Sequence, residues 1–116
     1  MDIEYRVIVE HKRSYDEGCQ LRRGETVDLG PRDTHWSSWL WCTTSSGQSA
    51  WVPEQILNIS NNRRAVVTAD YNSIELTVKP GDMVMGIHVL SGWVWCKNIH
   101  NETGWVPLEN LQSAAS

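Results

Sequence analysis

Phenylalanine is absent from this sequence of 116 residues, although tryptophan occurs seven times. The N-terminal segment, MDIEYRVIVEHKR, contains no long apolar run, so we expect neither a signal peptide nor a membrane span, and a cytoplasmic protein with no membrane partner. Apolar residues with helical periodicity are also lacking almost everywhere. Tryptophan side chains are costly to leave in solvent, so the seven of them must serve cores, grooves or an interface.

An excess of basic side chains is missing as well, because the formal net charge is −4. Residues 1–60 carry six basic and nine acidic side chains, and residues 61–116 carry four and five. Neither half has the positive footprint of a nucleic-acid-binding protein, so no nucleic acid is expected as a partner. A basic partner is electrostatically easier for this chain than an acidic one.

Cysteine is scarce, with three residues and therefore no disulfide framework. Cys42 and Cys96 occupy equivalent places in two copies of a repeat, which is typical of small apolar core positions. No C-x-x-C or H-x-x-x-H pattern and no glycine-rich phosphate loop occurs in the sequence. We therefore expect no metal, no cofactor and no catalytic residues, and we interpret the protein as a non-enzyme.

The repeat itself is the strongest feature of the sequence. WLWCTTSSGQSAWVP at residues 39–53 returns as WVWCKNIHNETGWVP at residues 93–107, with three Trp, one Cys, a Val and a Pro each displaced by 54 positions. Such spacing indicates a duplication of a unit of fewer than 60 residues. The sequence therefore predicts a first domain at residues 1–58, a short polar linker at 59–64 and a second domain at 65–116.

Short runs rich in β-formers follow one another in both halves, separated by Gly, Pro, Asn and Ser clusters. The pattern predicts an all-β barrel or sandwich. Residues 79–82, KPGD, are typical of a turn before a strand, and residues 23–25 take their place in the first copy. Residues 43–49 and 97–103 are expected to be hairpin loops.

Alternation along the repeated strand separates two kinds of side chain. Leu40 and Cys42 are expected to point into the core, with Trp39 and Trp41 on the opposite face, and the second copy repeats this arrangement. Trp51 or Trp105 of the neighbouring strand would join the tryptophan face. An exposed aromatic patch usually marks a contact surface. Packing of these rings on the other half of the chain or on a long loop is an equally weighted alternative.

At this point the residues resemble a known family. The second copy reads ADY at 69–71, ELTVKPGD at 75–82, GWVW at 92–95 and GWVPLENL at 104–111, an order similar to that of the Src-homology-3 (SH3) domain. The first copy matches more loosely, and the matches cover about residues 5–57 and 65–111. The whole arrangement is similar to small bacterial proteins made of tandem SH3 domains. The resemblance implies an all-β chain of two tandem five-stranded SH3-like barrels.

In that family a shallow aromatic groove accepts a peptide in the polyproline II conformation. The resemblance implies ligand-binding roles in the second copy for Tyr71, Glu75, Trp93, Trp105, Pro107 and Asn110. Glu75 would be the acidic partner of a basic ligand residue. Ala69 and Asn110 stand where the family has groove tyrosines, so recognition of a PxxP segment by this copy should be weak.

The first copy keeps a longer loop and a groove of different shape. The residues implied for ligand binding there are His11, Tyr15, Asp16, Glu17, Trp39, Trp51, Pro53 and Ile56. The segment from Asp28 to Ser38 carries a three-residue excess that includes Pro31, His35 and Trp36. We expect this copy to be slightly more suited to a ligand than the second.

Three functions follow from these expectations. The leading hypothesis is a non-catalytic module that binds a short proline-rich or basic segment of a protein partner. A second is a structural two-barrel unit, or a homodimer that packs through Trp41 and Trp95. A third is attachment to the bacterial cell wall, which would require export.

Overall fold

The structure, a computed structural model, describes residues 2–14 and 18–114. The expectation of an all-β protein is confirmed, since the only helices in the described part are two short 3₁₀ turns, η1 (Glu54–Ile56) and η2 (Leu108–Asn110). The strands are β1 (Ile3–Val7), β2 (Gln20–Leu21), β3 (Thr26–Arg32), β4 (Trp39–Thr43), β5 (Ser49–Pro53), β6 (Leu57–Ile59), β7 (Arg64–Val67), β8 (Tyr71–Asn72), β9 (Met83–Leu90), β10 (Trp93–Lys97), β11 (Thr103–Pro107) and β12 (Leu111–Ser113).

Two compact units share this chain, and each contains a five-stranded antiparallel sheet. Unit 1 comprises Met1–Glu17 and Ile74–Ser116, and its strands follow the order β11-β10-β9-β1-β12. Unit 2 comprises Gly18–Ser73, with the order β5-β4-β3-β7-β6 and an additional ribbon of β2 and β8. In each sheet three consecutive strands form a meander, and a fourth strand joins the meander to the fifth.

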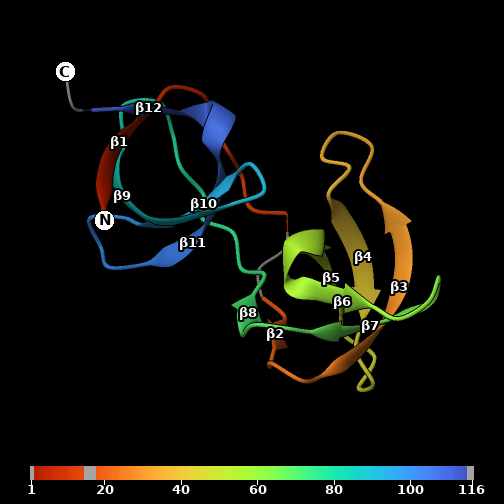
Figure 1. Cartoon of the computed structure of the whole chain (residues 1–116). Coiled ribbons are helices and arrows are strands. Elements are labelled where there is room, and N and C mark those ends of the chain that lie inside the picture. Colours follow the sequence, from red (N-terminus) through yellow and green to blue (C-terminus); the bar gives the residue numbers. More distant parts are fainter. Residues whose placement is uncertain (1, 15–17, 115–116) are drawn as a thin grey trace. The chain divides into compact units, whose positions relative to one another are not determined.

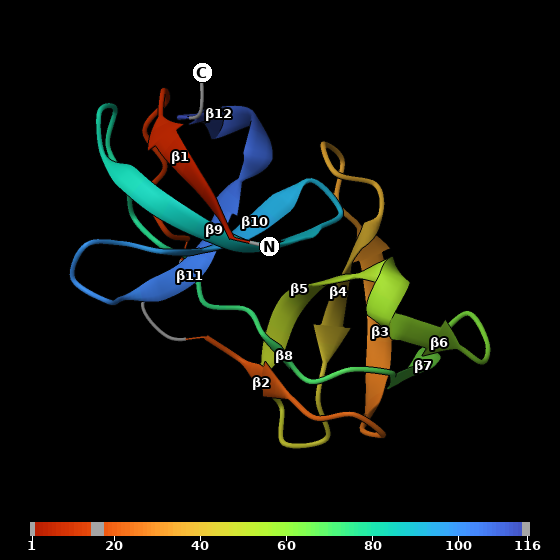
Figure 2. The ribbon, with the colours of Figure 1, turned by 60° about the vertical axis from the view of Figure 1, so that its left-hand side comes forward.

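The division differs from the expected succession of 1–58, 59–64 and 65–116, because the two repeats exchange their first strands. β1, from the first repeat, lies between β9 and β12 of the second repeat (Figures 1 and 2). β7, from the second repeat, lies between β3 and β6 of the first. The red β1 among blue-green strands in Figure 1 shows the exchange directly.

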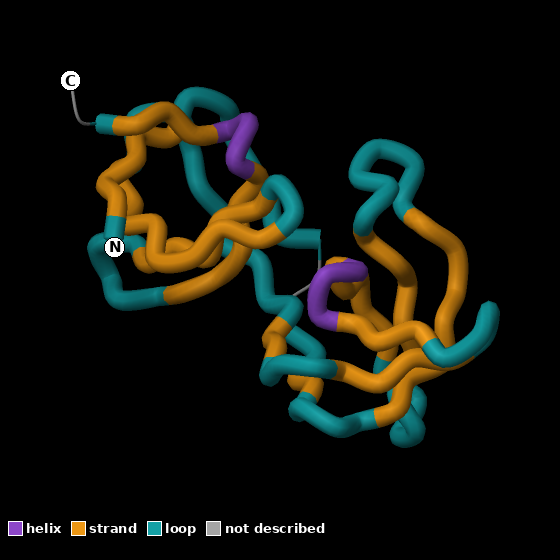
Figure 3. Tube along the Cα trace, in the orientation of Figure 1, coloured by secondary structure: helices purple, strands orange, loops and turns teal. Residues whose placement is uncertain are grey.

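The segment expected to be a linker is instead part of a hairpin that joins the two repeats. β6 and β7 are paired neighbours, so residues 60–63 form the turn of a hairpin, which is drawn as one of the loops in Figure 3. The Asn61 side-chain oxygen accepts hydrogen bonds from the backbone N–H groups of Arg63 and Arg64, at 2.8 and 3.1 Å. This turn returns β7 into the sheet of the first repeat and leaves the remaining position, in unit 1, to β1.

The exchanged strands make matching backbone contacts in the two units. Val7 N–H donates to Asp82 and its carbonyl accepts from Gly81, at 2.9 and 2.8 Å. Val67 does the same with Glu25 and Gly24, at 2.8 and 2.7 Å. Both glycines have a positive φ, +94° and +91°, which a side chain would strain. The turns expected at residues 79–82 and 23–25 are therefore present, and the backbone of each turn forms hydrogen bonds with a strand from the other repeat.

Alternation along β4 and β10 follows the expected pattern on the core side. Leu40, Cys42, Val94 and Cys96 are all buried. Burial raises the pKa of Cys96 to about 12, and burial followed by the nearby Cys19 raises the pKa of Cys42 to about 11. Both are free thiols that stay protonated at neutral pH, in agreement with their interpretation as core residues.

We predict that a fragment of residues 18–73 folds alone, whereas a fragment of residues 1–58 does not. The first contains every strand of unit 2, while the second lacks β7, the strand with which β6 pairs. Amide dispersion in proton–nitrogen NMR spectra and a cooperative thermal transition would measure folding in both. A dispersed spectrum from residues 1–58 would contradict the exchange, because β1 would then have completed its own repeat's sheet.

Candidate functional site

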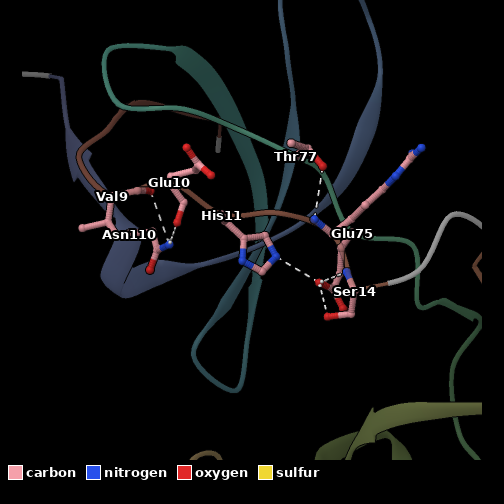
Figure 4. Close-up of polar contacts among 8 residues, drawn as sticks. Val9, Glu10, His11, Ser14, Glu75, Thr77 and Asn110 are labelled. Atoms are coloured by element: carbon pink, nitrogen blue, oxygen red, sulfur yellow. Dashed lines mark hydrogen bonds and ion pairs between the residues drawn. The ribbon is translucent and has the colours of Figure 1, made fainter.

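The candidate site of unit 1 is built where two distant segments run side by side. Residues 8–14 pass antiparallel to residues 74–78, and His11 and Val78 exchange backbone hydrogen bonds of 3.0 and 2.8 Å. Two positions further along, Arg13 N–H donates to the Thr77 hydroxyl at 3.1 Å. This short ladder brings the His11 side chain of the first repeat to Glu75 of the second (Figure 4).

The Glu75 carboxylate is the most enclosed charged group of this site, with 8% of the residue exposed. Its Oε1 accepts from the Ser14 backbone N–H at 3.2 Å and from the Ser14 hydroxyl at 3.1 Å. His11 Nε2 lies 2.9 Å from the same oxygen (Figure 4). Because an ionised carboxylate only accepts hydrogen bonds, the imidazole must carry a proton on Nε2. Three donors thus compensate the burial of one carboxylate.

Trp93 completes the open side of this group. Its ring centroid lies 5.4 Å from that of His11, at an interplanar angle of 80°, which is the edge-to-face arrangement favoured by aromatic pairs. Both residues are half-buried, so part of each ring faces outward. Trp93 follows a two-residue turn in which Ser91 and Gly92 both have a positive φ, and it lies opposite Pro107 in the sheet.

Asn110 holds the chain that leads to His11. Its side-chain amide donates to the carbonyls of Val9 and Glu10, at 3.3 and 3.2 Å (Figure 4). Its own backbone carbonyl accepts from Ile8 at 2.8 Å. The residue is buried, so in the described structure it acts as a clamp on residues 8–10. Asn110, a position expected to contact ligand, thus holds the segment that leads to His11.

Trp105 supports the Glu75 segment from the other side. Its backbone N–H donates to Ile74 at 2.9 Å and its carbonyl accepts from Leu76 at 3.1 Å. A Cβ on the preceding residue, Gly104, would lie 2.7 Å from the backbone of Glu75 and Leu76, so only glycine permits this approach. The Trp105 ring is buried against Trp95, with centroids 5.3 Å apart.

A second aromatic group lies in unit 2. Tyr71 donates its hydroxyl to the Trp51 carbonyl at 2.9 Å, and its ring centroid is 6.5 Å from that of Trp39. Trp39 lies opposite Pro53, and the Ile56 carbonyl accepts from Thr68 at 2.8 Å. Exposed fractions of 5% for Trp39 and 7% for Tyr71 show that these rings are buried.

The loop between β3 and β4 borders this second group. Asp33 accepts from the backbone N–H groups of His35 and Trp36, at 2.8 and 3.0 Å. Arg32 donates to the Ser37 carbonyl at 2.9 Å and to the Glu54 carboxylate at 2.5 Å. The hydrogen bond from Arg32 lowers the pKa of Glu54. These bonds hold the loop that carries the half-buried Trp36 next to η1. In the sequence, the position of Trp36 within the three-residue excess of residues 28–38 was its only distinguishing feature.

The structure thus groups the residues expected at the two grooves by unit, and this grouping differs from the grouping by repeat. It brings His11 to Glu75, Trp93, Pro107 and Asn110 in unit 1, and Tyr71 to Trp39, Trp51, Pro53 and Ile56 in unit 2. His11 and Tyr71 have exchanged places relative to the grouping by repeat. Tyr15, Asp16 and Glu17 lie outside the described residues. Ser14, which supplies two donors to Glu75, carried no signal in the sequence.

Comparison with known proteins adds two findings. A scan of the sequence against protein-family models gives no match, and a search of curated proteins gives none either. Among residues 2–14 and 18–114, no helix has the length and apolar character needed to cross a membrane. The same residues contain no cluster of three or more His, Cys, Asp or Glu side chains suited to a metal ion.

We predict that Glu75→Ala lowers the free energy of unfolding by about 1–3 kcal/mol, because His11 and Ser14 would lose their acceptor inside the protein. Glu75→Gln, which keeps an acceptor oxygen, should cost less. Urea unfolding followed by tryptophan fluorescence measures both. Glu10→Ala is the matched control, since the Glu10 carboxylate is exposed and its ion pair with Lys12 is long, at 3.8 Å. Equal losses for Glu75→Ala and Glu10→Ala would contradict a structural role for the buried carboxylate.

Proposed function

We propose that this chain is a non-catalytic protein-interaction module that binds a short extended segment of a partner at His11, Glu75 and Trp93 of unit 1. The observation that carries the proposal is the half-buried, edge-to-face pair of His11 and Trp93 beside a buried carboxylate. The rings offer an apolar surface for a proline or aliphatic side chain, and the carboxylate offers a partner for a basic one.

The resemblance to SH3 domains supports this proposal. Each unit contains a five-stranded antiparallel sheet, as expected of an SH3-like barrel, and unit 1 has Trp93 opposite Pro107 with the acidic Glu75 nearby in the fold. We therefore interpret both units as SH3-like barrels whose first strands are exchanged. In this interpretation the ligand groove of unit 1 is assembled from both repeats.

Exposure favours unit 1 over unit 2 as the ligand-binding unit, in contrast to the slight preference drawn from the sequence. Trp39 and Tyr71 are buried, and the Tyr71 hydroxyl is engaged by the Trp51 carbonyl. In unit 1, Trp93 and His11 keep part of their surface outside. We assign the aromatic group of unit 2 to stability of the fold.

Glu75 limits the affinity that this site can reach. A basic ligand residue gains little from this carboxylate, because Glu75 is buried and its Oε1 already accepts from Ser14 and His11. Contact with Trp93 then supplies most of the binding free energy. A shallow site with one ring anchor corresponds to a dissociation constant on the order of micromolar.

A structural role is the second candidate, and the paired tryptophans favour it. Trp41 lies opposite Trp51 with ring centroids 5.1 Å apart, and Trp95 lies opposite Trp105 at 5.3 Å. Rings satisfied in this way within their own sheets need no ligand. Packing of a second copy against Trp41 and Trp95, which are half-buried, stays a prediction of this alternative.

We predict that Trp93→Ala abolishes binding of proline-rich and Arg-containing peptides, because it removes the half-buried ring that anchors the ligand in this proposal. Trp39→Ala, the equivalent change in unit 2, is the control and should leave affinity unchanged. A proton–nitrogen NMR titration of the wild type with a peptide pool, read at the indole signals, locates the contact. We expect shifts at Trp93. Shifts confined to Trp36, Trp39 and Trp51 would transfer the site to unit 2, and no shift at any indole would favour the structural role.

A further inference from the structure

Tyr5 and Gly86 fit each other closely in unit 1. The buried Tyr5 ring on β1 covers Gly86 of β9, where an added Cβ would lie 2.4 Å from Cε2 and 2.9 Å from Cδ2 of the tyrosine. The same Cβ would lie 3.0 Å from Cγ1 of Val94. Any side chain at residue 86 would therefore displace the tyrosine, and the glycine provides the space that the ring occupies.

Unit 2 has the opposite sizes at the equivalent positions. The sheet registers identify them, since Tyr5 lies opposite Val84 in unit 1 and Ala65 lies opposite Val27 in unit 2. Two residues further along the same strands, Gly86 and Leu29 lie opposite the equivalent cysteines of the two repeats. Unit 1 thus combines a tyrosine with a glycine, and unit 2 combines an alanine with a leucine.

A third position follows the same rule. Val94 of unit 1, which approaches Gly86, is replaced in unit 2 by the longer Leu40, and both side chains are buried. The two cores therefore fill similar space with different partners. A strand with tyrosine suits the sheet with glycine and valine, and a strand with alanine suits the sheet with two leucines.

We propose that these sizes select which first strand enters which sheet. If each repeat kept its own first strand, Tyr5 would meet Leu29 and Leu40, and overpacking would force side chains or backbone to shift. Ala65 would meet Gly86 and Val94 and leave a cavity. The hydrophobic pattern of the two strands is otherwise alike, with Val7 and Val67 both buried, so size decides the pairing.

The selected pairing also determines the composition of the candidate sites. Residues 8–14 follow β1 and residues 68–72 follow β7, so the exchange brings His11 to Glu75 and Tyr71 to Trp39. Where it concerns ligand binding, this inference rests on the proposed function. The placement of the strands is independent of any ligand. Tyr5 and Ala65 are thus positioning residues that act through the segments attached to them.

Reporter disulfides in the full chain test the selection. Glu4 lies opposite Met85, and both side chains are exposed, so Glu4→Cys with Met85→Cys should form a bridge in the exchanged fold. Asp28 is the position in unit 2 equivalent to Met85, so Glu4→Cys with Asp28→Cys reports the unexchanged fold. Chains with only one of the new cysteines control for the native thiols, which are buried.

We predict that the 4–85 bridge forms in the otherwise wild-type chain and the 4–28 bridge does not. The double variant Tyr5→Ala, Ala65→Tyr exchanges the two sizes between the strands while the sheets stay unchanged. It should therefore move β1 to the sheet of its own repeat and lower the ratio of 4–85 to 4–28 bridges at least about tenfold. A 4–28 bridge in the wild type, or an unchanged ratio in a folded double variant, would overturn the proposal.

A second measurement applies even where that double variant does not fold. Gly86→Ala should lower the melting temperature of the wild type sharply, because the new methyl group displaces Tyr5. In a Tyr5→Ala background the same change should have a clearly smaller effect, since the ring is gone and only the 3.0 Å approach to Val94 Cγ1 remains. Additive losses would overturn the proposal. The wild-type chain could also fail to bind peptides while the bridge ratio and the Tyr5–Gly86 coupling are as predicted. That result would contradict the proposed function alone and would leave the strand selection intact.

Discussion

Pairing of β1 with β9 and β12 is the interaction on which the rest of unit 1 depends. β12 forms its ladder with β1, and β9 would otherwise present an unpaired edge next to the core. Since β1 begins at residue 3 and β12 ends at residue 113, the contact closes a loop of nearly the whole chain. Unit 2 closes between residues 18 and 73, so its contacts are more local. Loop-closure entropy therefore favours formation of unit 2 before unit 1.

The same pairing carries the candidate site. Beyond Val7 the chain continues past Asn110, which holds the carbonyls of Val9 and Glu10, and then reaches Glu75 through His11 and Ser14. The half-buried His11 imidazole is thus held by a segment that lies 64 positions before the carboxylate it contacts. Neither repeat alone contains the site, and the function proposed for unit 1 is a property of the exchanged arrangement.

Local patterns predicted the hairpins and the core thiols, because the two-residue period of a strand is written in neighbouring residues such as Leu40 and Cys42. The partner of a strand is not local information. β1 and β7 have similar apolar patterns, so grouping by repeat placed His11 with Trp39 and treated residues 59–64 as a linker. The distinction between the strands is one of side-chain size, at Tyr5 and Ala65, and it has meaning only once Gly86 and Leu29 are known to lie beside them. Ser14 was missed for a similar reason, since its partner is 61 positions away.

Strand pairing and the buried carboxylate stabilise each other. Removing β1 from unit 1 would withdraw the ladder at His11 and with it three hydrogen-bond donors of Glu75, leaving an enclosed charge without compensation. Each lost bond to a group that stays buried costs about 1–3 kcal/mol, so the polar contacts penalise a misplaced strand in addition to the steric fit of Tyr5. The apolar fit alone would tolerate adjustment, because cores can repack around a changed volume. The carboxylate of Glu75, which needs donors from residues 11 and 14, tolerates less displacement of β1 than the apolar core does. Hydrogen bonds weaken steeply when the donor–hydrogen–acceptor angle departs from linear. The buried Glu75 therefore also favours the strand arrangement that brings it beside His11 and Ser14.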